Sequence, residues 1–210
     1  MVKGRNWSSP LGLTCRAIEA NVDTCTLDMN SVINRRKLIL VTPAVGKAMI
    51  AFNSKDFGSF LTHPLLAAQT PSFADRGNFV FSAQGVDIQH GDGRVVFEGV
   101  FVGEKWRCEL KRGSTNSRRA AIDVTHVPSE EDGTSSSSSP SLSIQDKDAI
   151  EMELTMVISQ FFSDLVFELD GTFLSFQDMN LFNPKDGSGA QVLMALGITV
   201  RKFPSPGLEF

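Results

Sequence analysis

The side chains that could carry out acid–base or metal chemistry are few and widely spaced. The three histidines, His63, His90 and His126, fall at an expected helix end, turn and strand end, and none belongs to an HxH or HExxH pattern. Asp87 and Asp92 flank one turn, and paired acids act as general acid and base only where folding brings them into a cleft. The sequence therefore predicts no catalytic residue and no metal site.

Potential nucleophiles lie outside the contexts that activate them. Ser54 and Ser59 are not part of a GxSxG elbow. Cys15, Cys25 and Cys108 form no CxxC pair, and their odd number is typical of free thiols in a reducing compartment. The turn sequence GDGRVVFEG lacks the GK[ST] ending of a phosphate-binding loop. We therefore expect a protein that is not an enzyme and that carries no cofactor.

Composition restricts the classes of partner. The 210 residues are 41% hydrophobic and 21% charged, with a net charge of −4. Nucleic-acid binders normally carry a basic patch, so we expect no nucleic-acid partner. No uninterrupted apolar run approaches the ~20 residues that span a bilayer. Sixteen phenylalanines and no tyrosine indicate apolar surface, either in a core or in a pocket for an apolar ligand.

The elements that must position these residues follow an N-terminal segment without clear periodicity. Residues 1–23 are expected to be irregular, shortened or a targeting segment, because Lys3, Arg5 and Arg16 precede the first acid, Glu19. Residues 24–210 are expected to form a single domain.

The first predicted helix follows a predicted strand pair at Leu38–Val41 and Ala48–Phe52. Asn53 is its expected N-cap, and Asp56 is spaced like the second member of a capping box. One face of this helix carries three large apolar side chains at helical spacing: Phe57, Phe60 and Leu61.

An antiparallel meander is predicted in the middle of the chain, because short alternating stretches are joined by glycine-containing turns. Its strands are expected at 79–88, 94–102, 106–110 and 119–127. The serine-rich stretch at about 129–148 holds little that can be buried, and we expect a disordered insertion there.

A second amphipathic helix and a closing hairpin are predicted after the insertion. The helix is expected to end at Gly171, with Ile150–Thr155 either helical or still strand. Its apolar stripe includes Phe161, Phe162 and Leu165. Strands are expected at Thr172–Phe182 and Gln191–Phe203. The predicted class is α+β, with a curved antiparallel sheet packed on one or two amphipathic helices.

Phenylalanine-rich helices on a curled sheet permit two arrangements. They can fill the concave side of the sheet as an ordinary core, or they can line a tunnel for an acyl chain or another apolar ligand. The sequence leaves both open.

Two stretches of the chain resemble a known family. AFNSKDFGSFLTHPLL is similar to the a-x-x-x-[ST]-x-x-D-[LF]-x-x-[FL]-L element of the LmeA-type lipid-binding family, whose photosynthetic-lineage members are a domain of unknown function. ISQFFSDLVFELDGTFLSFQDMNLF and VLMALGITVRKFPSPG resemble its closing helix and strand pair. The resemblance covers roughly Arg36 to Gly207.

The resemblance implies a fold akin to tubular lipid-binding proteins and phospholipid binding or transfer without a reaction. It also implies a chloroplast (plastid) location with peripheral membrane contact, the alternative being a cytoplasmic protein. The candidate lining of the lipid site is Phe57, Phe60, Leu61, Phe161, Phe162 and Leu165. The alternative function is a structural or assembly factor that binds a protein partner through the same apolar face.

Overall fold

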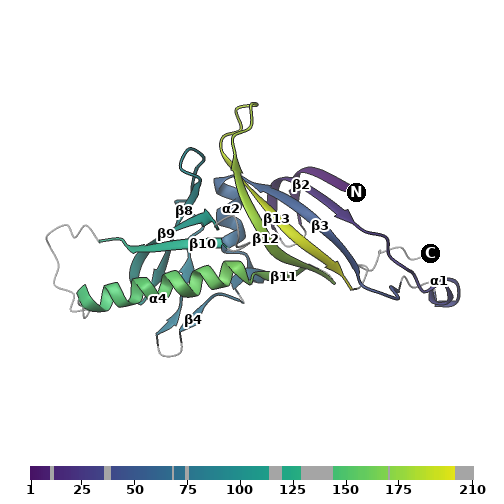
Figure 1. Cartoon of the computed structure of the whole chain (residues 1–210), viewed down its shortest axis with the longest axis horizontal. Helices are drawn as coiled ribbons and strands as arrows, with labels where there is room; N and C mark the ends of the chain where they lie inside the picture. Colours follow the sequence, from purple (N-terminus) through teal and green to yellow (C-terminus); the bar gives the residue numbers. More distant parts are fainter. Residues whose placement is uncertain are drawn as a thin grey trace.

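Two antiparallel sheets lie end to end in the computed structural model, with helix α2 (Ser54–Leu61) between them (Figure 1). The structure describes residues 1–9, 12–35, 39–67, 69–73, 76–113, 120–128, 144–169 and 171–201. Curved antiparallel sheets packed with helices confirm the predicted α+β class.

The larger sheet joins the two ends of the chain. In spatial order its six strands are β1 (Val2–Ser8), β2 (Thr14–Val22), β3 (Ala44–Phe52), β13 (Gln191–Val200), β12 (Thr172–Phe182) and β11 (Val166–Leu169). The prediction of an irregular segment at 1–23 is wrong, because β1 and β2 form a hairpin whose second strand pairs with β3. The prediction that this segment is a targeting signal is a separate matter and stays a prediction.

The smaller sheet is the predicted meander. β8 (Arg94–Phe101), β9 (Glu104–Arg112) and β10 (Ala120–His126) pair in sequence order. The first strand of the prediction is split into β6 (Val80–Phe81) and β7 (Asp87–Gln89), both of which pair with β8. A two-stranded ribbon, β4 (Ser72–Phe73) with β5 (Gly77–Asn78), stands beside this sheet (Figure 1).

The start of α2 is the one predicted from its sequence. The Asn53 side chain accepts a hydrogen bond from the Asp56 backbone N–H at 2.8 Å. The Asp56 carboxylate contacts β2, where it accepts a hydrogen bond from the Thr14 hydroxyl at 2.7 Å and pairs with Arg16 at 3.4 Å. The short helix α3 (Pro64–Ala67) follows directly.

The long helix α4 (Ile144–Ser163) differs from its prediction at both ends. The predicted disordered insertion is wrong for residues 144–148, which are helical, and its remainder at 129–143 lies outside the described residues. The strand alternative for Ile150–Thr155 is also wrong. The helix ends at Ser163 rather than at Gly171, because the residues after it pair with β12 as β11 and Gly171 turns that hairpin with a φ of 79°.

Of the predicted strand at Leu38–Val41, residues 39–41 do not form a strand, and Leu38 lies outside the described residues. In this stretch only Leu40 makes a strand-type contact, an isolated bridge to Leu27, among the residues described. The strand begins instead at Ala44 and runs through Gly46. A Cβ atom on Gly46 would lie 2.2 Å from the Asn21 carbonyl oxygen, so this glycine lets β2 and β3 approach closely.

Aromatic contacts of α2 join the two sheets. The Phe57 ring lies 6.2 Å from that of Phe52 on β3 and 6.1 Å from that of Phe97 on β8, measured between ring centroids. The Phe60 ring lies 5.2 Å from Phe52 and 5.9 Å from Phe167 on β11. One hydrophobic cluster therefore runs through both sheets.

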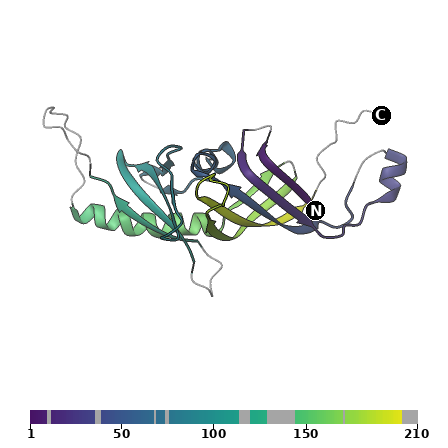
Figure 2. The same ribbon diagram turned by 90° about the horizontal axis from the view of Figure 1, so that it is seen from above.

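Helix α4 runs along β10 and hydrogen-bonds to its backbone (Figures 1 and 2). Three helical side chains spaced four residues apart accept bonds from alternate strand N–H groups: Ser159 from Ile122 and Thr155 from Val124, both at 3.1 Å, and Glu151 from His126 at 3.3 Å. Four helical residues rise about 6 Å and two strand residues about 6.6 Å, so the acceptors on α4 and the N–H donors on β10 have nearly the same spacing. The helix thereby closes an edge that could otherwise pair with another chain.

Thr155→Val is expected to lower the free energy of unfolding by about 1 kcal/mol, because valine keeps the shape but leaves the Val124 N–H without its acceptor. Urea unfolding measures the change. Thr125→Val is the matched control, since Thr125 is exposed on β10 itself. Equal free energies of unfolding for Thr155→Val and Thr125→Val would contradict a stabilising role for the hydrogen bond between Thr155 and Val124.

Candidate functional site

The six side chains predicted to line an apolar cavity lie together in the central cluster. Phe161 is half-buried and packs against that cluster, and the other five are buried within it: Phe57, Phe60, Leu61, Phe162 and Leu165. The Phe161 and Phe162 rings lie 5.7 and 6.1 Å from that of Phe81, which faces them from β6. In this structure their surroundings are other side chains. Their contact with a lipid stays a prediction, because it requires the rings to move apart.

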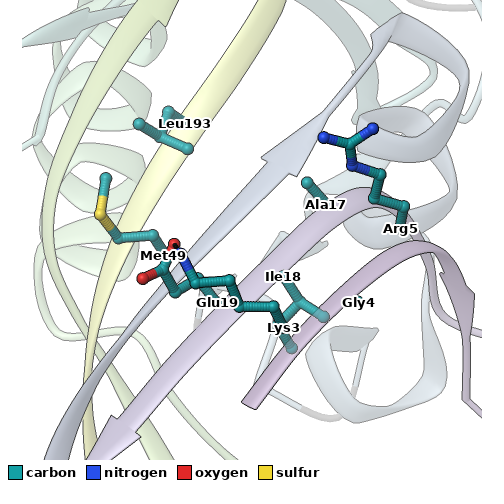
Figure 3. Close-up of a pocket in the computed structure, with 8 residues that line it drawn as sticks. All are labelled: Lys3, Gly4, Arg5, Ala17, Ile18, Glu19, Met49 and Leu193. Atoms are coloured by element: carbon teal, nitrogen blue, oxygen red, sulfur yellow. Dashed lines mark ion pairs between the residues drawn. The ribbon is translucent and has the colours of Figure 1, made fainter. Parts of the chain in front are cut away.

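A groove of about 480 Å³ lies elsewhere, on the face of the six-stranded sheet that is turned away from α2 (Figure 3). We call it the outer groove. Eight residues from four strands line it: Lys3, Gly4, Arg5, Ala17, Ile18, Glu19, Met49 and Leu193.

Strand register explains why this groove exists. One row of paired residues crosses β1, β2 and β3 as Lys3, Glu19 and Met49, all with long side chains. The next row places Ala17 and Ala51 between Arg5 at one end and Leu193 at the other. Because residues in these rows point to the same face of the sheet, Ala17 leaves a depression between longer neighbours.

The groove combines an apolar floor with cations at one end. Ala17, Met49 and Leu193 contribute the apolar surface. The Lys3 ammonium pairs with the Glu19 carboxylate at 3.0 Å, which offsets its charge. Within the described part of the chain, Arg5 has no ion pair shorter than 4 Å, so it is the cation left to a ligand.

Arg5 also acts on a carboxyl group at longer range. The pKa of Asp186 is lowered, first by hydrogen bonds from Ser188 and to a smaller extent by the charge of Arg5. Asp186 is therefore ionised at neutral pH, and its carboxylate offsets part of the Arg5 charge from outside ion-pair distance.

A second depression, of about 360 Å³, lies on the smaller sheet. Its lining comes from β8 and the segments beside it: Ser82, Gln84, Gly85, Glu98, Gly99, Val100 and Lys105. Val100 is its one large apolar side chain, whereas Ile18, Met49 and Leu193 line the outer groove.

The polar groups that could do acid–base chemistry serve structural contacts. The Nε2 atom of His126 lies 3.1 Å from the Glu104 carboxylate and 3.3 Å from the Lys147 ammonium, and its ring packs on Trp106 in a T-shaped arrangement. These contacts hold the first turns of α4 against β9 and β10. Among the described residues, no three His, Cys, Asp or Glu side chains are placed to hold a metal ion.

The remaining candidates from the sequence do not converge. The Nδ1 atom of buried His63 accepts a hydrogen bond from the Leu65 backbone N–H at 3.3 Å, at the start of α3. His90 is exposed in its turn. Asp92 pairs with Arg94 at 3.1 Å, while Asp87 accepts a hydrogen bond from Gln89 at 2.7 Å.

The three cysteines are free, and two of them are buried. Burial, and to a smaller extent the charge of Asp56, raises the pKa of Cys15 to about 11. Burial also raises the pKa of Cys108. Both thiols are therefore protonated at neutral pH and poor nucleophiles. Cys25 is exposed.

Comparisons of the chain with protein-family models, with curated proteins and with solved structures found no match. The resemblance to the LmeA-type family therefore stays a prediction. In the part of the chain that the structure describes, no helix is both long and apolar enough to cross a membrane.

Proposed function

We propose that this chain binds an amphipathic lipid with an anionic head group and does not transform it. The observation that carries the proposal is the outer groove, whose apolar floor ends at Arg5, a cation that has no ion pair within 4 Å among the described residues. An acyl chain would lie over Ala17, Met49 and Leu193, where contact removes apolar surface from water. The head group would lie beside Arg5, whose planar guanidinium suits phosphate or carboxylate oxygens.

The family resemblance and the plastid location that it implies belong to this proposal, since both predict a phospholipid as the ligand. The proposed site differs from the six residues nominated from the sequence. Those residues would join it only in a state in which the central cluster opens. A protein partner could contact these side chains only if the central cluster opened in the same way, because Phe57, Phe60 and Leu61 have at most 1% of their surface exposed.

Met49→Asp is expected to weaken lipid binding by about tenfold or more. The reason is that a methionine side chain in full contact contributes about 1.5–3 kcal/mol, and the new carboxylate repels an anionic head group. Displacement of a fluorescent fatty acid by lysophosphatidylglycerol measures the affinity.

Val45→Asp is the matched control for this titration. Val45 lies on the same strand and the same face as Met49, is also exposed, and lies outside the groove. It should bind lipid as the unsubstituted chain does. An equal loss of lipid affinity in Met49→Asp and Val45→Asp would contradict the proposed site. Recovery of a chemically altered lipid would contradict a role limited to binding.

A further inference from the structure

The segment between β2 and β3 projects from the end of the larger sheet and carries helix α1 (Met29–Arg35) at its far end (Figures 1 and 2). We call residues 26–35 and 39–41 the tip. Two backbone hydrogen bonds close its base, from the Asp28 N–H to Ile39 at 2.9 Å and from the Val41 N–H to Thr26 at 2.9 Å. The tip is therefore a defined structure, with Leu40 at its base packed against the hydrophobic cluster and α1 projecting beyond it.

Helix α1 is held by its own cap. The Asp28 carboxylate accepts hydrogen bonds from the backbone N–H groups of Asn30 and Ser31, at 3.0 and 3.2 Å, and from the Ser31 hydroxyl at 2.6 Å. These bonds lower the pKa of Asp28, so its charge is already engaged within the tip.

Large apolar side chains on the tip face water. Ile33 is 71% exposed and Val41 61%, and Met29 and Ile39 are exposed as well. Met29 and Ile33 are four residues apart, which places them on one face of α1. Ile39 and Val41 flank Leu40, the residue that bridges to Leu27, and both are exposed. Exposed apolar side chains gathered on one projection indicate a contact surface.

The basic residues of the tip indicate which kind of surface it would contact. Arg35 is exposed at the end of α1, and the sequence continues with Arg36 and Lys37. From Thr26 to Val41 the sequence has three basic residues and one acidic residue, Asp28, although its overall net charge is −4. A second copy of the tip would bring like charges together. An anionic bilayer instead offers head groups to the cations and an acyl boundary to the apolar side chains.

We propose that the tip docks the protein onto an anionic lipid bilayer. Met29, Ile33, Ile39 and Val41 enter the boundary between head groups and acyl chains, and Arg35 stays at the level of the head groups. The docking concerns a membrane surface and does not depend on the outer groove, which takes one lipid molecule.

Vesicle flotation of the whole chain tests this docking. The vesicles contain phosphatidylcholine alone or mixed with phosphatidylglycerol. We expect the chain to float with the mixed vesicles, to bind them less at raised salt, and to bind neutral vesicles weakly. Ile33→Asp and Met29→Asp should each reduce binding to mixed vesicles about tenfold or more.

Met152→Asp is the matched control. It makes the same substitution as Met29→Asp at a methionine that is 76% exposed on a helix, but on α4. It should float as the unsubstituted chain does. Equal flotation of Ile33→Asp and the unsubstituted chain would overturn the proposal. So would a dimer in solution that Ile33→Asp converts to a monomer, because the tip would then be a contact between copies.

Discussion

Replacing Phe57 by alanine is expected to lower the free energy of unfolding by about 3–5 kcal/mol. The Phe57 side chain is fully buried and contacts aromatic rings of both sheets, Phe52 on β3 and Phe97 on β8. Its removal leaves a cavity where neither sheet can close without moving the other. Since domains are typically stable by about 5–15 kcal/mol, this variant should be close to unfolding. Urea unfolding followed by tryptophan fluorescence measures the change.

Phe161→Ala is the control for this substitution. It deletes the same atoms from a half-buried ring at the margin of the cluster. We expect Phe161→Ala to lower the free energy of unfolding much less than Phe57→Ala does, because water already reaches part of the Phe161 side chain. Equal costs at the two positions would show that α2 does not link the sheets as described.

Gly58→Ala is expected to destabilise the protein although alanine favours helices. A Cβ atom at this position would lie 2.1 Å from the Ala83 carbonyl oxygen, between β6 and β7. Overpacking costs about 1–3 kcal/mol, and we expect the upper end because the obstacle is backbone. The gain in helix propensity over glycine is only about 1 kcal/mol. The midpoint of thermal unfolding should therefore fall.

Ser59→Ala separates the two effects. It makes a substitution to alanine at the next position, where the serine hydroxyl bonds only to the Lys55 carbonyl of its own helix. It should leave the unfolding midpoint unchanged or slightly raised. A midpoint that rises for Gly58→Ala as well would mean that α2 does not lie against the Ala83 segment.

Elements with local signals could be predicted from the sequence. Helix α2 begins where Asn53 can cap it, and that hydrogen bond involves residues only three apart. The closing hairpin was predicted because β13 alternates cleanly, with Val192, Met194 and Leu196 all turned inward. Such patterns are fixed by the chain itself and need no knowledge of distant partners.

Elements held by distant partners were missed. β1 is an edge strand whose residues are mostly exposed, so it shows no hydrophobic period of two, and Lys3 and Arg5 instead suggested a targeting segment. The end of α4 was misplaced because Val166–Leu169 continues the apolar content of the helix and becomes strand only by pairing with β12.

The outer groove could not be predicted for the same reason. It depends on the register of four strands, which brings Arg5, Ala17 and Leu193 into one row although they are far apart in the sequence. The six phenylalanine and leucine positions were recognised as apolar, but periodicity does not tell a filled core from a lined cavity. In the structure they pack on one another.

Native mass spectrometry of the chain mixed with lysophosphatidylglycerol tests the proposed function most directly. The account predicts one bound lipid per chain, with less bound lysophosphatidylcholine, because Arg5 favours an anionic head group. Arg5→Glu should lose the bound lipid. Lys47→Glu, which makes the same change of charge on the same face of the sheet but outside the groove, should keep it. Absence of bound lipid, or equal binding by Arg5→Glu and Lys47→Glu, would contradict the account.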